Sequence, residues 1–206
     1  MTDPYYKVLS SAVSIEFEEK KSRFLGFLYP AQTRETAFSH LNALKHTYPD
    51  ACHYCWAYLF GDPNQPKTQA FNDDGEPSGT AGKPILHVLT QRGCGDTMAI
   101  VVRYFGGIKL GAGGLVRAYS SAVSQAVDLA DFTERRPLIQ LQLTLPFALE
   151  SIIRRLIDDY DGCIHELEYS HEVTLRMHLE GNRQQSFNAD LQQLSSGSIV
   201  VKVLDD

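Results

Sequence analysis

The glycines of this chain are concentrated in one segment, and that segment limits what the first part of the chain can fold into. The sequence has 206 residues and 15 glycines, and ten of the glycines lie between Gly75 and Gly114. A backbone needs this much glycine where turns are tight or where two backbone segments approach closely. We therefore expect residues 75–114 to contain two ordered loops, each of which leads into a helix.

The last third of the chain has the clearest secondary-structure pattern. Apolar and polar residues alternate over 139–145, as they do in a half-buried strand. Apolar residues at helical spacing and further strand patterns then predict helices over 147–160 and 184–194, and strands over 163–169, 173–179 and 199–204. The order βαββαβ is that of a ferredoxin-like domain.

The first two thirds of the chain predict a mixed α/β layout. The expected elements are strands over 13–17 and 23–29 around a Lys20-Lys21 turn, a helix over 33–48, a strand over 53–60, a long loop over 61–82, a short helix over 83–90, a buried strand over 97–105 and a helix over 112–130. Residues 134–137 end in a proline, which cannot continue a helix, and so predict a linker. We place one domain over 1–134 and a second over 138–206.

Composition excludes several classes of protein. Hydrophobic residues make up 43% of the chain and charged residues 21%, which excludes a disordered chain. No apolar run approaches the roughly 20 residues of a membrane span, and residues 1–7 lack the apolar stretch of a signal peptide, so we expect a cytoplasmic protein with no membrane partner. The net charge of -6 argues against broad non-specific binding of DNA, which needs a basic face.

The second glycine-rich stretch, residues 101–115, has the pattern of an anion-binding turn. A strand runs into glycines that open a helix, and the N–H groups at a helix N-terminus attract anions. Neither the dinucleotide fingerprint nor the Walker motif is present. We predict an anion- or RNA-binding surface, with close packing alone as the alternative, from Lys83, Arg103, Gly106, Gly107, Lys109, Gly111, Gly113 and Arg117.

The first glycine-rich stretch, residues 72–84, predicts an ordered loop. Its acidic residues do not have the EF-hand pattern, and no nucleophile motif surrounds Ser78, so we expect neither a metal site nor a catalytic residue there. The side chains of such a loop more often cap its own backbone. The residues that we expect to structure it are Asp74, Gly75, Glu76, Pro77, Ser78, Gly79, Thr80 and Gly82.

The four cysteines do not form a recognisable metal or disulfide framework. Cys52 and Cys55 are spaced as a C-x-x-C pair, but the residues that follow continue a strand, in which the two side chains face opposite ways. No second pair completes a zinc site, so we expect free thiols and no cofactor. His53 and Cys55 share a strand face, and we predict that they line a pocket together with Tyr104.

The sheet of the second domain lacks the features of an RNA recognition motif. That motif stacks bases on aromatic side chains of its central strands. The outward-facing positions of the first and third strands here hold Gln140, Gln142, Thr144, Thr174, Arg176 and His178. A docking surface for a protein or for an RNA backbone remains open for this face.

Three segments together resemble the IMPACT family. They are the run from Gly95 through Val101-Val102-Arg103-Tyr104-Phe105-Gly106-Gly107-Ile108-Lys109-Leu110-Gly111, the loop over 73–84, and His53-Tyr54-Cys55. The likeness covers nearly the whole chain and is closest to the bacterial, two-domain branch. It implies a first domain with a ribosomal-protein-S5-domain-2-like fold, and a ferredoxin-like second domain similar to the C-terminal domain of elongation factor G.

The resemblance implies a role linked to translation. Eukaryotic relatives regulate translation under amino-acid starvation, but they carry a different additional domain, so their protein partner does not transfer to this chain. We expect a non-enzymatic binding or regulatory protein that contacts RNA or a ribosomal component through the glycine-rich loops. The alternatives are a hydrolase or transferase acting on a phosphorylated small molecule, and a regulator that binds another protein.

Overall fold

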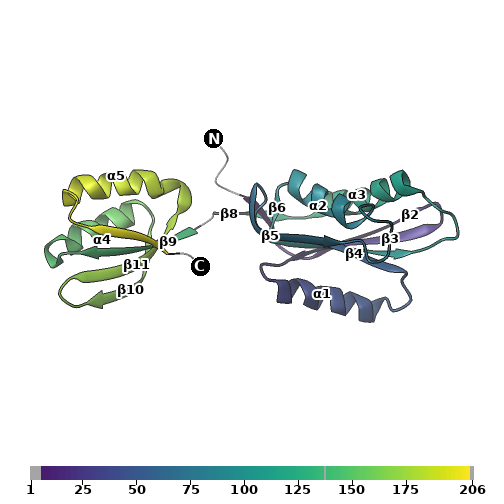
Figure 1. The fold of residues 1–206 in the computed structure, drawn as a ribbon, viewed down its shortest axis with the longest axis horizontal. Coiled ribbons are helices and arrows are strands. Elements are labelled where there is room, and N and C mark those ends of the chain that lie inside the picture. The colour runs from purple at the N-terminus through teal and green to yellow at the C-terminus, as the bar shows by residue number, and fades with distance from the viewer. Residues whose placement is uncertain (1–5, 137, 205–206) are drawn as a thin grey trace. The chain divides into compact units, whose positions relative to one another are not determined.

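The computed structural model describes residues 6–136 and 138–204. The chain divides into two compact units, of which the first ends at Arg135 and the second begins at Arg136. Both units combine helices with largely antiparallel sheets (Figure 1), so the expected α+β class is confirmed. None of the helices in this part of the chain is long and apolar enough to cross a membrane.

The first unit is built on a five-stranded antiparallel sheet in the order β2-β3-β7-β4-β5. Its strands are β2 (Val13–Glu19), β3 (Ser22–Pro30), β4 (His53–Asp62), β5 (Gln65–Asn72) and β7 (Thr97–Tyr104). The central strand β7 is buried from Thr97 to Arg103. Burial on both faces explains why this strand is a continuous apolar run rather than an alternating one.

Helices cover both faces of this sheet, as Figure 1 shows: α1 (Arg34–Thr47) lies on one face, and α2 (Gly82–Gln91) and α3 (Ala112–Leu129) lie on the other. Two apolar cores result, one on each side of the sheet. Helix α3 lies very close to β3, because a Cβ added at Gly26 would come within 2.9 Å of the Ala122 carbonyl oxygen. Only glycine permits this approach.

A smaller sheet completes the first unit, in the order β6-β1-β8: β6 (Cys94–Gly95), β1 (Tyr6–Leu9) and β8 (Phe132–Arg135). Asp96 joins it to the main sheet. The Asp96 carboxylate accepts hydrogen bonds from the Tyr6 hydroxyl at 3.0 Å and the Gly61 N–H at 2.9 Å, and it pairs with Arg135 at 2.5 Å. Burial, together with the neighbouring Asp96 charge, raises the pKa of Tyr6 to about 12.

Two expectations for the first unit are wrong. The predicted loop over 61–82 contains β5, which pairs with β4 along its length. Most of β5 is polar and exposed because it is an edge strand, so it has no apolar alternation to detect. Half of the predicted linker over 134–137 belongs to β8, which pairs with β1; Pro137 itself lies outside the described residues.

The second unit is a four-stranded antiparallel sheet in the order β10-β11-β9-β12, with two helices on one face. Its elements are β9 (Leu138–Leu145), a 3-10 turn (Phe147–Leu149), α4 (Glu150–Asp159), β10 (Cys163–Tyr169), β11 (Val173–Glu180), α5 (Gln184–Ser195) and β12 (Val200–Leu204). This is the predicted βαββαβ order of a ferredoxin-like fold. The expected helix over 147–160 begins with this 3-10 turn and has its first regular turn at Glu150, and a second 3-10 turn, Gly181–Arg183, precedes α5.

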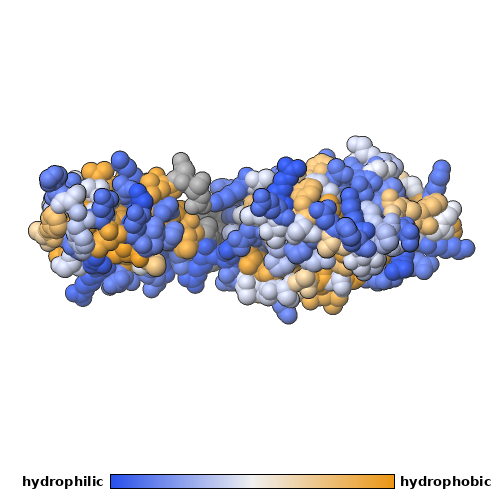
Figure 2. Space-filling model, turned by 90° about the horizontal axis from the view of Figure 1, so that it is seen from below, coloured by the Kyte–Doolittle hydropathy of each residue, from blue (hydrophilic) through white to orange (hydrophobic). Residues whose placement is uncertain are grey.

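The face of each unit that Figure 2 shows is mainly hydrophilic. On the face that Figure 2 shows, hydrophilic residues separate the apolar ones into small patches. Scattered apolar side chains of this kind are normal for a folded domain. The individual exposed apolar residues therefore need an explanation only where they adjoin a candidate site.

The substitution Ile85→Ala truncates a side chain of α2 that is fully buried against the sheet, and it is expected to lower the free energy of unfolding by about 3 kcal/mol. The control is Leu129→Ala at the end of α3, a residue that is 69% exposed, which should change it by less than about 0.5 kcal/mol. Urea unfolding followed by the fluorescence of Trp56, the one tryptophan of the chain, measures both. Equal effects of the two substitutions would contradict the core assignment.

Candidate functional site

The loop between β5 and α2 is organised by Asp73. One oxygen of its carboxylate accepts hydrogen bonds from the N–H groups of Ala81 at 3.0 Å and Gly82 at 2.8 Å, and the other accepts from Gly79 at 2.8 Å. These are the donors at the start of α2, where the helix end is electropositive. The anion site at this helix is therefore already occupied by a carboxylate of the protein itself.

The next residue, Asp74, attaches the same loop to β4. Its carboxylate accepts a hydrogen bond from the Tyr54 N–H at 2.6 Å, and its carbonyl oxygen lies 2.8 Å from Nδ1 of His53. Asp74 and Gly75 both have positive φ, which produces the sharp turn that makes these contacts. The carboxylates of Asp73 and Asp74 thus bind backbone N–H groups.

Glu76 enters the interior and forms a buried ion pair with Arg103 of β7. Glu76 is 9% exposed and Arg103 is 5% exposed. The same Glu76 oxygen accepts a hydrogen bond from the Arg103 guanidinium and another from the Tyr119 hydroxyl of α3 at 2.7 Å. Burial, together with the nearby Cys55 thiol and Glu76, raises the pKa of Tyr119 well above its ordinary value.

This burial corrects the expectation that Arg103 contacts a ligand at the surface. Its charge is already paired, and a second nitrogen lies 3.4 Å from the Ser22 hydroxyl. The sequence pattern of an apolar strand followed by glycines does not show that Arg103 pairs with Glu76, which lies 27 positions earlier. Arg103 instead connects the two glycine-rich loops from inside.

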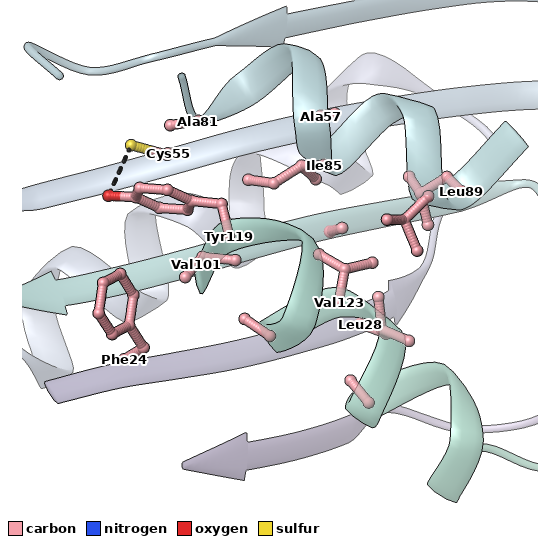
Figure 3. Packing of buried hydrophobic residues seen from close by; sticks show 14 of the residues in the cluster. Phe24, Leu28, Cys55, Ala57, Ala81, Ile85, Leu89, Val101, Tyr119 and Val123 are labelled. Atoms are coloured by element: carbon pink, nitrogen blue, oxygen red, sulfur yellow. Dashed lines mark hydrogen bonds between the residues drawn. The ribbon is translucent and has the colours of Figure 1, made fainter. Parts of the chain in front are cut away.

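The predicted pocket of His53, Cys55 and Tyr104 does not form. Cys55 is fully buried on the α2–α3 side, where its sulfur lies 2.9 Å from the Asp73 carbonyl oxygen and 3.3 Å from the Tyr119 hydroxyl (Figure 3). His53 covers the edge of this cluster, with Nε2 3.9 Å from Glu76. Tyr104 faces the opposite core, because neighbouring residues of β7 point to opposite faces of the sheet.

The second glycine-rich loop, residues 105–111, packs against the turn between β2 and β3. A Cβ added at Gly106 would come within 1.8 Å of the Lys21 carbonyl oxygen, and the Gly106 N–H donates to the Ser22 hydroxyl at 3.2 Å. Only glycine allows this contact. This contact brings Lys20 and Lys21 beside the loop. The sequence predicts a turn at these two lysines but not its position next to the loop.

Helix α3 differs from the other helices of the first unit in having an open start. Helix α1 is capped by Thr33, whose hydroxyl accepts from the Thr36 N–H at 3.2 Å, and α2 is closed by Asp73. The cap position of α3 is Gly111, with φ of 74°, no side-chain cap and no acidic residue in the first turn. Its first N–H groups therefore remain available to an external acceptor.

A hollow of about 230 Å³ lies between this end of α3 and the end of β2. Its lining includes Lys20, Leu110, Gly114 and Arg117, together with one carboxylate, that of Glu19. Four exposed cations lie on the turn, loop and helix around it and form no ion pair with any residue in the described ranges: Lys20, Lys21, Lys109 and Arg117. The local charge is positive although the whole chain is acidic.

The predicted site residues therefore separate into those near this hollow and those elsewhere. The structure brings together Gly106, Gly107, Lys109, Gly111, Gly113 and Arg117 in the loop and the first turns of α3. Lys83 lies on α2, in a different hollow lined by Pro63, Pro66 and His87 beside β5. Because β5 and β2 are opposite edges of the sheet, Lys83 is separated from Lys20 and Arg117 by the width of the sheet.

A larger hollow of about 560 Å³ lies at the other end of the strands, between the start of α1 and β8. It contains none of the residues predicted from the sequence. Its two buried or half-buried charges, Asp96 and Arg135, already pair with each other. The other charged residue of the lining, Glu134, is acidic, so among the described residues this hollow offers no unpaired cation to an anionic ligand, and the smaller hollow at α3 is the better candidate.

Comparison with known proteins places the chain in a family. The model of the Impact N-terminal domain matches residues 20–127, which include both glycine-rich loops, the β2–β3 turn and most of α3. The chain belongs to the IMPACT family. Curated relatives match it over almost their full length: an IMPACT family member of Haemophilus influenzae is 36% identical over 97% of each chain, and the IMPACT family member YigZ of Escherichia coli is 36% identical over 96% of this chain and 97% of its own.

A solved structure has a similar fold over almost the whole chain. A crystal structure of a hypothetical protein is 35% identical, covers 98% of both chains and superposes with a TM-score of 0.70. The Protein IMPACT homolog of Dictyostelium discoideum is 30% identical over 61% of this chain, which corresponds to 35% of its own length. The IMPACT resemblance stated from the sequence motifs is therefore confirmed.

The environment of Cys55 predicts its reactivity. Burial raises the pKa of the Cys55 thiol well above normal and that of Cys94 to about 11, so both stay protonated at neutral pH, whereas Cys52 and Cys163 are exposed. We expect two of the four thiols to react rapidly with a disulfide reagent in the native protein, and all four after denaturation. A double Cys52→Ser, Cys163→Ser variant should show no rapid phase; a third rapid thiol in the parent would contradict the buried cluster.

The contact between Gly106 and Lys21 predicts a stability difference between neighbouring glycines. Gly106→Ala forces the loop away from the turn and should lower the free energy of unfolding by about 3 kcal/mol. The control is Gly107→Ala. The added Cβ of this variant lies in open space, and its only cost is that alanine must adopt a φ of 85°, which costs about 1 kcal/mol. Urea unfolding measures both, and a Gly106→Ala variant as stable as Gly107→Ala would contradict the contact.

Proposed function

We propose that this protein is a non-enzymatic regulatory protein of translation that contacts RNA, free or within the ribosome, through the hollow at the start of α3. The observation that carries the proposal is a helix N-terminus that no side chain of the described residues caps, beside four cations that form no ion pair within the same ranges. Backbone N–H groups and lysine or arginine side chains are the groups that proteins use to bind RNA phosphates. The IMPACT resemblance supplies the link to translation.

The conformation of the β2–β3 turn supports the proposal. Lys20 and Lys21 have φ of 48° and 61°, and two-residue turns of this kind normally use asparagine or glycine. A left-handed conformation costs a residue with a Cβ about 1 kcal/mol. Strain that is retained in a folded protein frequently marks a functional position. A need for positive charge beside the glycine-rich loop explains why lysines, and not asparagine or glycine, occupy both positions of this turn.

The size of the hollow favours a phosphate of a polymer over a small substrate. Pockets for small molecules commonly enclose about 300–1,000 Å³, more than the 230 Å³ found here. The nucleophile candidates of the adjoining cluster, Cys55 and Tyr119, are buried and have raised pKa values, so neither is activated for catalysis. These observations favour a binding role over hydrolase or transferase activity.

The acidity of the chain limits the number of phosphates that bind. The net charge is -6, and the hollow itself includes Glu19. A few local contacts are compatible with this charge, whereas coating of nucleic acid is not. With three phosphate contacts, the logarithm of the RNA affinity should fall with the logarithm of salt concentration with a slope of about -2.

Reversing the charge of the turn is expected to weaken RNA binding at least tenfold at low salt and to make the salt dependence less steep, because phosphate contacts are lost. The double variant Lys20→Glu, Lys21→Glu is compared with Lys83→Glu, an exposed lysine on the other side of the helical layer that should have little effect. Fluorescence anisotropy of a labelled RNA measures affinity across salt concentrations. Absence of RNA affinity in the parent, or equal effects of the two variants, would refute the proposal.

A further inference from the structure

We propose that Phe105 is a stacking platform for an unpaired base, so that the RNA bound at this site is single-stranded. This inference rests on the proposed function and specifies the form of RNA that it binds. Phe105 follows β7 and begins the second glycine-rich loop, and 47% of its surface is exposed. An exposed aromatic ring beside cations is the arrangement that proteins use to hold single strands.

Phe105 is distinguished from the other exposed aromatic residues by its neighbours. In the described part of the chain, the exposed Phe and Tyr residues are Phe71, Phe105, Phe147 and Tyr169. Phe147 and Tyr169 lie on the second domain and stack on each other, with ring centroids 6.2 Å apart. Phe71 belongs to β5, at the far edge of the sheet from the turn. Phe105 alone among these four adjoins the cationic turn.

The ring of Phe105 rests on a rigid support. The Arg103 guanidinium carbon lies 5.6 Å from its centroid and 5.4 Å from the centroid of Phe24, so the guanidinium contacts both rings. The ion pair with Glu76 fixes the guanidinium from the interior. A ring that is already held in place loses little conformational freedom when a base stacks on it, which favours affinity.

The cations are positioned to hold the backbone of the same strand. The residue after Phe105 is Gly106, whose backbone touches Lys21, so the ring and the turn are joined through one residue. Lys109 lies three residues further along the loop, before α3. Two of the neighbouring carboxylates are already neutralised, because Glu76 pairs with Arg103 and Glu16 pairs with Arg23 at 2.6 Å. A third carboxylate, that of Glu19, lines the hollow itself.

Single strands are favoured because the bases of a duplex already stack on each other. A protein ring gains a base only where that base is unpaired and can leave the stack. The phosphates alone would bind single and double strands with little discrimination. The aromatic ring therefore predicts a preference that the cations cannot supply.

The test compares Phe105→Leu, which keeps an apolar side chain but removes the aromatic face, with Phe105→Tyr, which restores it. Anisotropy with a single strand and with its duplex is expected to show at least a tenfold loss for Phe105→Leu on the single strand only, with an unchanged salt slope, and near-parental affinity for Phe105→Tyr. Phe71→Leu is the matched control at the far edge and should bind as the parent does. A single strand that carries 2-aminopurine should lose fluorescence with the parent and with Phe105→Tyr, but not with Phe105→Leu.

The outcomes separate this inference from the proposed function. If the parent binds neither form of RNA, both fail. If the parent binds RNA but Phe105→Leu binds the single strand equally well, or loses single strand and duplex to the same degree, the stacking inference alone is overturned. Loss of ribosome co-sedimentation by Phe105→Leu with intact affinity for the free single strand would assign the ring to a protein contact and would also overturn it. Unchanged thermal unfolding of each variant excludes misfolding.

Discussion

The buried pair of Glu76 and Arg103 connects every part of the candidate site. Glu76 belongs to the first glycine-rich loop, Arg103 to the central strand, and Tyr119, which donates to the same carboxylate, to α3. Removing one member of a buried ion pair leaves the other charge unpaired in the interior, which costs about 3–5 kcal/mol. Two loops that are far apart in the sequence are therefore held in one arrangement, and the exposed ring of Phe105 is supported from beneath by the same guanidinium.

The two glycine-rich loops share a high glycine content but have opposite electrostatic outcomes. In the first, Asp73 satisfies the start of α2, so the glycines serve the turn and its closure. In the second, no side chain in the described part of the chain closes the start of α3, and the glycines allow the loop to contact the β2–β3 turn. The difference depends on the carboxylate of Asp73, which folds back onto the start of α2, whereas no carboxylate of the described residues accepts from the start of α3. A shared richness in glycine is thus compatible with one loop that closes a helix start and one loop that leaves a helix start open.

Most of the fold could be predicted from local patterns, because these strands and helices are amphipathic or wholly buried. The second domain is the clearest case: the alternation in 139–145 corresponds to β9, whose inward-facing leucines are fully buried. Strand β5 escaped detection because an edge strand with both faces exposed has no apolar period. The short strands β1 and β8 are defined by their pairing with each other, which a local pattern does not encode.

The site was harder to predict, because its essential relations are long-range. The sequence identified Arg103 as a cation near glycines, but its partner is 27 residues away, and the pairing removes it from the surface. Conversely, Lys20 and Lys21 were recognised as a turn, and only the contact between Gly106 and Lys21 brings them to the site. The residues next to a glycine-rich loop in the sequence therefore do not predict the charge around that loop. The residues that contact the backbone of the loop determine this local charge.

The contrast between net charge and local charge determines what such a protein can recognise. An acidic chain repels a polyanion at long range, but at physiological salt this repulsion is screened beyond about 8 Å. Within that distance the cations of the turn and the open helix end dominate, and they act only on a phosphate that enters the hollow. If the protein binds RNA as proposed, its overall acidity adds discrimination, because the RNA must supply a correctly placed phosphate, and an unpaired base beside the ring of Phe105, before attraction exceeds repulsion.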